Sequence, residues 1–113
     1  MHEMSLCEGI LQVLEDNAKT QHFSKVKTVW LEIGTLSGVE VEAMLFCFDA
    51  VSRGTLAQHA RLEIMHTPGL AWCMKCAKNV TVMQRFDECP QCGSYQLQVV
   101  GGDEMKIKEL EVE

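Results

Sequence analysis

Residues 73–92 read CMKCAKNVTVMQRFDECPQC, and this stretch decides how the chain is organised. It holds two C-x-x-C units, Cys73 to Cys76 and Cys89 to Cys92, separated by twelve residues. Each unit can form a tight turn that presents two sulfur atoms on one side, and paired units at this spacing are typical of a zinc ribbon. Four thiolates complete a tetrahedral shell without an open position, so we predict a structural zinc site and no catalysis at the metal.

The segment around the cysteines is too poor in apolar side chains to fold by burial alone. Its notable apolar groups are Leu70, Trp72, Val80, Val82, Phe86, Tyr95 and Leu97. Structural zinc couples to folding with apparent free energies on the order of 10 kcal/mol, which would supply the stability that apolar burial does not provide. An alternative interpretation treats Cys89 and Cys92 as a redox-active pair, but such a pair requires no second C-x-x-C unit.

The residues on either side of this segment predict an α+β body. Apolar periodicity predicts five elements there, namely helices over 4–21 and 39–53 and strands over 26–33, 61–66 and 105–112. We therefore expect a small three-stranded sheet with two helices, plus an inserted four-cysteine zinc-ribbon domain. The expected division assigns residues 1–69 and 101–113 to the α+β body and residues 70–100 to the ribbon, with hinges at the glycine and proline residues between them.

The second predicted helix is apolar on more than one side. The side expected to face the core carries Val39, Ala43, Phe46, Cys47 and Ala50. Further apolar residues lie off this side, at Val41, Leu45 and Phe48. The helix is therefore either buried on two sides, which we expect for a small domain, or offers an apolar surface to a partner.

Length, charge and composition narrow the function classes. The chain has 113 residues, about one domain, and a formal net charge of -6 without a basic block, so we expect no nucleic-acid partner. No apolar run approaches the roughly 20 residues that span a bilayer, and no secretory signal is evident, which predicts a cytoplasmic protein without a membrane partner. The absence of a phosphate-binding loop and of a hydrolytic triad favours a binding protein over an enzyme.

The first residues form a candidate chelate of a different kind. The α-amine of Met1, the His2 amide nitrogen once deprotonated and the His2 ring can occupy neighbouring positions on one ion, and the Glu3 amide or carboxylate can add a donor. Nitrogen donors of this kind suit Ni²⁺ or Cu²⁺ in square-planar geometry. Taken alone, a histidine at position 2 is more often an incidental exposed residue, so the residues by themselves leave nickel, copper and no metal open.

Several stretches together resemble the HypA/HybF family of nickel-insertion accessory proteins for nickel-iron hydrogenase maturation. They are MHEMSL (1–6), WLEIG (30–34), LSGVE (36–40) and the double C-x-x-C, in the same order of parts over essentially the whole chain. The resemblance implies transient Ni²⁺ at Met1, His2 and Glu3 and structural Zn²⁺ at the four cysteines. It also implies two partners, a HypB-like GTPase and the hydrogenase large-subunit precursor that receives the nickel, and it places Glu40 near the nickel in some members.

Two functions compete with nickel delivery. One is a zinc-ribbon interaction module without a second metal, and the other is a redox-active dithiol enzyme.

Cys7 and Cys47 fall within apolar helix stripes, so we predict that both are buried small hydrophobes rather than ligands. His22, His59 and His66 lack neighbours at ligand spacing, although His66 lies nearest the ribbon and is a candidate for coupling the two metal regions. The sequence leaves a monomer and a homodimer open.

Overall fold

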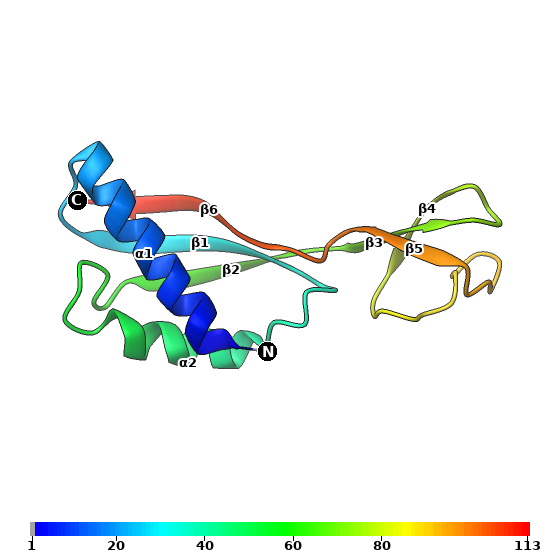
Figure 1. Cartoon of the computed structure of the whole chain (residues 1–113), viewed down its shortest axis with the longest axis horizontal. Coiled ribbons are helices and arrows are strands. Elements are labelled where there is room, and N and C mark those ends of the chain that lie inside the picture. Colours follow the sequence, from blue (N-terminus) through cyan, green and yellow to red (C-terminus); the bar gives the residue numbers. More distant parts are fainter. Residues whose placement is uncertain (1) are drawn as a thin grey trace. The chain divides into compact units, whose positions relative to one another are not determined.

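The computed structural model describes residues 2–113, which form two helices and six strands (Figure 1). In chain order these are α1 (Glu3–Gln21), β1 (Val26–Gly34), α2 (Val41–Ser52), β2 (Arg61–Thr67), β3 (Gly69–Cys73), β4 (Lys78–Val82), β5 (Leu97–Gly101) and β6 (Met105–Val112). The chain divides into two compact units. Unit 1 comprises Met1–Leu31, Val39–Ile64 and Ile107–Glu113, and unit 2 comprises Glu32–Gly38 and Met65–Lys106.

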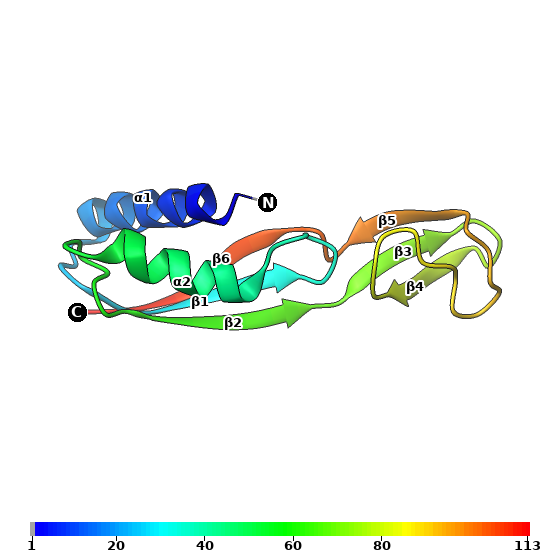
Figure 2. The same cartoon turned by 90° about the horizontal axis from the view of Figure 1, so that it is seen from below.

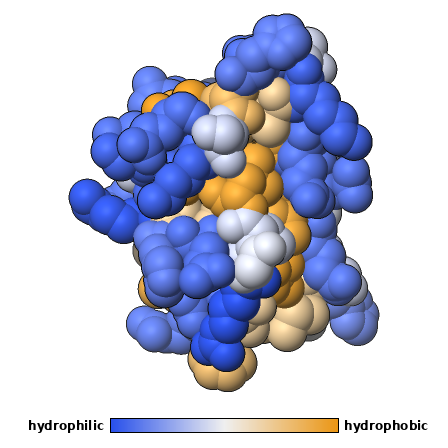
Figure 3. Space-filling view, turned by 90° about the vertical axis from the view of Figure 1, so that its left-hand side faces the viewer, coloured by the Kyte–Doolittle hydropathy of each residue, from blue (hydrophilic) through white to orange (hydrophobic). Residues whose placement is uncertain are grey.

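In unit 1, both helices pack on the same face of a three-stranded sheet with the order β2-β1-β6 (Figure 2). The core between these layers is made of fully or almost fully buried apolar side chains: Ile10, Leu14, Val26, Val29, Leu31, Met44 and Phe48. Each such side chain contributes about 1.5–3 kcal/mol relative to the exposed state. Seen from its end, unit 1 shows apolar side chains as a band bordered by hydrophilic ones (Figure 3).

Helix α1 follows its predicted amphipathic pattern. Cys7, Ile10 and Leu14 are buried at three- and four-residue steps, as expected for one face of a helix. The helix ends where His22 adopts a left-handed conformation with φ 60° and donates its N–H to the carbonyl of Ala18 at 2.9 Å. This C-terminal cap satisfies a carbonyl that the last turn would otherwise leave unpaired.

The prediction of which side of the second helix faces the core is wrong. Phe46, expected in the core, is 74% exposed, whereas the buried residues are Met44, Phe48 and Ser52, which recur every four positions. Because α2 carries apolar residues around most of its circumference, periodicity alone does not select the side that packs on the sheet. The expectation of burial on two sides also fails, since Leu45 is 39% exposed.

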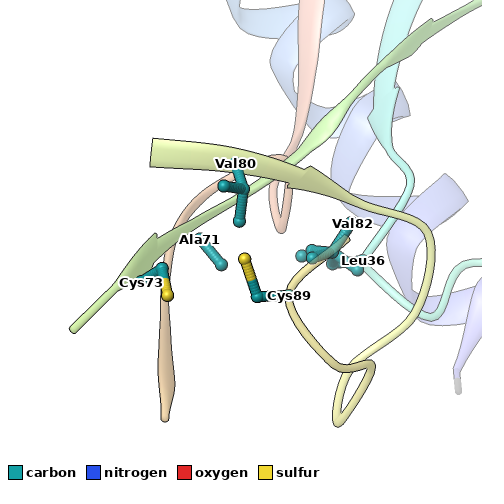
Figure 4. Close-up of a cluster of buried hydrophobic side chains, with 6 residues drawn as sticks. All are labelled: Leu36, Ala71, Cys73, Val80, Val82 and Cys89. Carbon is teal, nitrogen blue, oxygen red and sulfur yellow. The ribbon is translucent and has the colours of Figure 1, made fainter. Parts of the chain in front are cut away.

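Unit 2 contains a second three-stranded sheet, with the order β4-β3-β5, in which both neighbours of β3 are antiparallel. Ala71 pairs with Val80 on one side and with Val99 on the other, so these side chains share one face. On that face lies a small buried cluster of Leu36, Ala71, Cys73, Val80, Val82 and Cys89 (Figure 4). The sequence predicted none of these three strands, each of which has five residues.

Close backbone packing at two glycines brings Leu36 into unit 2. Gly102 has φ 76°, a conformation that favours glycine, and its carbonyl accepts the N–H of Leu36 at 2.7 Å. A Cβ atom on Gly34 would collide with the same carbonyl oxygen. The segment 34–38 therefore contributes Leu36 to the unit 2 cluster.

The predicted α+β class is confirmed, with two helices, two small three-stranded sheets and a four-cysteine cluster. The domain division at residues 70–100 stays a prediction. Within residues 2–113, no helix is both long and apolar enough to cross a membrane.

Candidate metal centre

The four cysteines of the two C-x-x-C units converge in unit 2. Their sulfur atoms all lie within 4.8 Å of one another, with Sγ–Sγ distances of 3.6 Å between Cys73 and Cys92 and 3.9 Å between Cys76 and Cys89. A tetrahedral site with metal–sulfur bonds of about 2.3 Å has edges of about 3.8 Å. The arrangement therefore fits a single four-coordinate, thiophilic cation such as Zn²⁺.

The two C-x-x-C units have the same local backbone geometry. The carbonyl of Cys73 accepts the N–H of Ala77, and the carbonyl of Cys89 accepts the N–H of Gly93, both at 2.8 Å. The donor residue has a positive φ in each case, 55° at Ala77 and 75° at Gly93. Each turn thus closes immediately after its second cysteine and aims both sulfur atoms to the same side.

Main-chain N–H groups prepare two of the sulfur atoms for negative charge. The Cys76 N–H points at Cys73 Sγ at 3.3 Å, and the Gln91 N–H points at Cys89 Sγ at 3.4 Å. The pKa of the Cys89 thiol is lowered to about 7, chiefly by the main-chain N–H of Cys92 and also by that of Gln91. These donors stabilise a thiolate without a counter-charge.

The neighbouring thiol of Cys76 shows the opposite effect. Its pKa is raised to about 12, first by its hydrogen bond with the Cys92 side chain, then by burial and by the other two sulfur atoms. Crowding therefore opposes ionisation of all four thiols together. A divalent cation at the centre would remove this opposition, because its charge would offset the repulsion between adjacent thiolates.

Access to the four sulfur atoms is uneven. Cys73 and Cys89 are buried in the unit 2 cluster shown in Figure 4, Cys76 is half-buried and Cys92 is exposed. Two of the thiols are thereby held by the core of the unit while one remains at the surface. The Cys92 sulfur is therefore the most accessible of the four.

The amino-terminal candidates are arranged differently. Met1 lies outside the described residues, and His2 is exposed, precedes α1 as its N-cap and makes no side-chain capping hydrogen bond. Glu3 begins α1, and its Oε2 accepts the main-chain N–H of Glu40 at 3.1 Å, which lowers the pKa of the Glu3 carboxyl group. This contact ties the start of α1 to the start of α2.

Within residues 2–113, the remaining cysteine and histidine side chains take part in no further group of three or more that could hold an ion. Cys7 is buried as predicted and Cys47 is half-buried, while His22, His59 and His66 are all exposed. Among the described residues, the four ribbon cysteines are the one group of three or more cysteine, histidine or acidic side chains close enough to share an ion.

Two structural features of the metal regions were absent from the sequence predictions. Leu36 falls within the predicted body, at 1–69, but it packs in the buried cluster that contains Cys73 and Cys89. The contact of Glu3 with the main chain of Glu40 joins residues 37 positions apart, and no sequence pattern indicates it. For Leu36, an apolar residue inside a glycine-bounded turn was the available signal.

The fold and site define a small two-unit α+β protein with a four-thiol metal ribbon. A family model described as hydrogenase/urease nickel incorporation, metallochaperone, hypA matches residues 1–112. The chain is 68% identical to the hydrogenase maturation factor HypA of Albidiferax ferrireducens and 62% identical to that of Azotobacter chroococcum, each over 113 residues and the full length of both chains. The chain belongs to the HypA family of nickel-incorporation metallochaperones, which are maturation factors and not enzymes.

The fold is also that of solved structures. The solution structure of the Ni metallochaperone HypA from Helicobacter pylori superposes with a TM-score of 0.70 at 23% identity, covering 99% of this chain and 97% of that one. A second solution structure, of a HypA protein, has a TM-score of 0.72 at 23% identity and covers 99% and 96% of the two chains. At this identity, the likeness establishes the shared architecture.

Proposed function

We propose that this chain binds Ni²⁺ through Met1, His2 and Glu3 and delivers it to the large-subunit precursor of a nickel-iron hydrogenase. The observation that carries the proposal is the match to the nickel-incorporation family over residues 1–112, together with relatives named as hydrogenase maturation factors. The proposed setting is the cytoplasm, with a HypB-like GTPase as a second partner. A homodimer is compatible with delivery and is not required by it.

The local structure at His2 supports nickel binding chemically. The first N–H groups of a helix have no intrahelical acceptor, so deprotonating a main-chain amide at the start of α1 breaks no helical hydrogen bond. The exposed His2 ring makes no capping bond that nickel would have to displace. Amine, amide and imidazole nitrogen atoms suit Ni²⁺, and the exposed position favours a labile complex that can exchange ligands with an acceptor.

For the four cysteines we propose structural Zn²⁺. The sulfur spacing fits the zinc tetrahedron, and zinc binding would supply the folding free energy that the small cluster of unit 2 lacks. With four protein ligands the ion has no open position, so its role would be to hold residues 70–100 as a separate ribbon domain. Nickel would thus be the cargo, and zinc would be a structural ion.

Nickel titration of variants of the zinc-loaded chain tests the cargo site. We expect wild-type protein to bind one Ni²⁺ with a d–d absorption band of nitrogen coordination. Two changes should abolish it: His2→Ala, which removes the imidazole, and one extra residue before Met1, which displaces the amine but keeps His2. His22→Ala is the matched control, since it removes an exposed imidazole at the other end of α1.

Delivery is then measured as nickel transfer from the loaded chain to purified large-subunit precursor. Unchanged nickel affinity in His2→Ala would contradict the binding site. If wild-type protein carries zinc but no nickel, the chain is instead an interaction module built on the ribbon.

A further inference from the structure

Helix α2 displays an aromatic side chain where none is needed for the fold. Phe46 is 74% exposed, the largest value among the large apolar side chains of unit 1 within the described residues. It lies opposite the buried line of Met44, Phe48 and Ser52, so no part of the sheet covers it. Leu45, 39% exposed, extends this apolar surface along the helix.

Acidic side chains flank the exposed phenyl ring. Glu42 lies four residues before Phe46 and Asp49 three residues after it, which places both on the same side of α2. We call Glu42, Leu45, Phe46 and Asp49 the α2 patch. Arg53 forms an ion pair with Asp49 at 3.1 Å, and no other basic residue lies on α2 or its caps.

The charge of the whole unit has the same sign as the patch. Unit 1 carries 11 acidic and 6 basic residues, whereas unit 2 carries 5 acidic and 4 basic ones. Almost all of the net charge of -6 therefore belongs to unit 1. A surface that approaches the α2 patch is favoured when it is basic around an apolar recess.

The α2 patch lies close to the amino-terminal residues. The N-cap residue of α2, Glu40, donates its main-chain N–H to Glu3 Oε2 at 3.1 Å. Phe46 follows six residues later, about 9 Å along the helix axis. A protein that takes nickel from residues 1–3 by ligand exchange must bring its own ligands into contact with them, and its surface then extends over the first turns of α2.

We propose that the α2 patch is the docking surface for the nickel-receiving large-subunit precursor, which would insert Phe46 into an apolar recess rimmed by lysine and arginine side chains. This inference rests on the proposed function, because it assigns the acceptor of the cargo to a particular face. A buried aromatic anchor carries much of the affinity of an interface, while the flanking carboxylates steer the encounter.

The test measures binding of the full, zinc-loaded chain to purified large-subunit precursor. We expect Phe46→Ala to weaken this binding about 30-fold, as is typical of an aromatic hot spot. The matched control is Phe86→Ala, which removes a phenyl ring that is 93% exposed in unit 2 and should leave the affinity unchanged. The double variant Glu42→Gln with Asp49→Asn should slow association and flatten its dependence on salt.

Nickel titration separates this proposal from the function on which it rests. Phe46→Ala should bind nickel as the wild type does, yet transfer it more slowly to the precursor. The assignment is overturned if Phe46→Ala binds the precursor normally or if the wild-type protein does not bind the precursor. It is also overturned if Phe46→Ala loses binding to the GTPase alone. The wild type could bind the precursor but no nickel, with precursor binding lost in Phe46→Ala. That result would overturn the proposed nickel cargo and leave the docking surface standing.

Discussion

Cys7 in unit 1 and Cys89 in unit 2 are both almost inaccessible to water, at 0% and 1% exposure, but their thiols differ chemically. Cys7 packs against Met44, with its Sγ 3.5 Å from the carbonyl oxygen and 3.9 Å from the thioether sulfur, and burial raises its pKa to about 11. Main-chain N–H groups lower the pKa of Cys89 to about 7. Burial alone makes a cysteine an inert apolar residue, whereas oriented N–H donors prepare it for a cation.

The largest expected effect comes from removing the prepared thiol. Cys89→Ser should lose stoichiometric zinc and unfold unit 2, because Cys89 is both a proposed zinc ligand and a member of the small buried cluster. Elemental analysis and amide hydrogen exchange resolved by residue would show protection lost in 65–106 and retained in α1. Cys47→Ser, outside the four-cysteine group, should keep its zinc. A protected, metal-free unit 2 in Cys89→Ser would contradict the structural role of the metal.

A smaller effect is expected from making the inert thiol polar. Cys7→Ser places a hydroxyl in an apolar site. The carbonyl oxygen of Met44 lies 3.5 Å from the Cys7 sulfur, and a serine oxygen, on its shorter bond to Cβ, does not reach as far toward it. The substitution should therefore destabilise unit 1 by about 1–3 kcal/mol. Urea unfolding followed by helical circular dichroism would measure this, with zinc content unchanged. Cys7→Ala separates lost volume from added polarity. Equal stability of the serine variant and the wild type would mean that the thiol is not treated as an apolar group.

The smallest expected effect is a dependence on alkaline pH. The unfolded chain releases the Cys7 proton near the ordinary value of 9.0, whereas the folded chain keeps it until about 11. Between these values the unfolded state binds fewer protons, so the contribution of Cys7 is fully present below pH 9 and is lost as pH rises to 11. Comparing wild type with Cys7→Ala cancels other titrating groups. Identical pH slopes in the two proteins would refute the shift.

Long, one-sided elements were predictable from the sequence, and short or all-apolar ones were not. Helix α1 has one apolar stripe, and β1, β2 and β6 have seven to nine residues, enough for their patterns to stand out. The strands β3, β4 and β5 have five residues each and lie among the cysteines, where alternation is too brief to detect. On α2, apolar residues on most sides made the choice of buried side depend on the sheet.

Some properties of the candidate site were likewise predictable from the sequence, and others were not. The spacing of the C-x-x-C units predicted which four side chains meet, because a four-residue turn sets the distance between its own sulfur atoms. The unequal burial and pKa values of those thiols depend on the cluster beneath them and on the hydrogen-bond donors that each turn presents. Nickel binding at residues 1–3 stays a prediction.

By itself, the sequence determined the α+β class, the family resemblance and the four cysteines whose sulfur atoms converge, all of which depend on residues near one another along the chain. Tertiary structure alone decided that Phe46 faces outward, that Cys7 lies against Met44 and that Glu3 meets the N–H of Glu40. The last two contacts join residues 37 positions apart. Such contacts follow from how the two helices pack, and local sequence patterns carry no information about that packing.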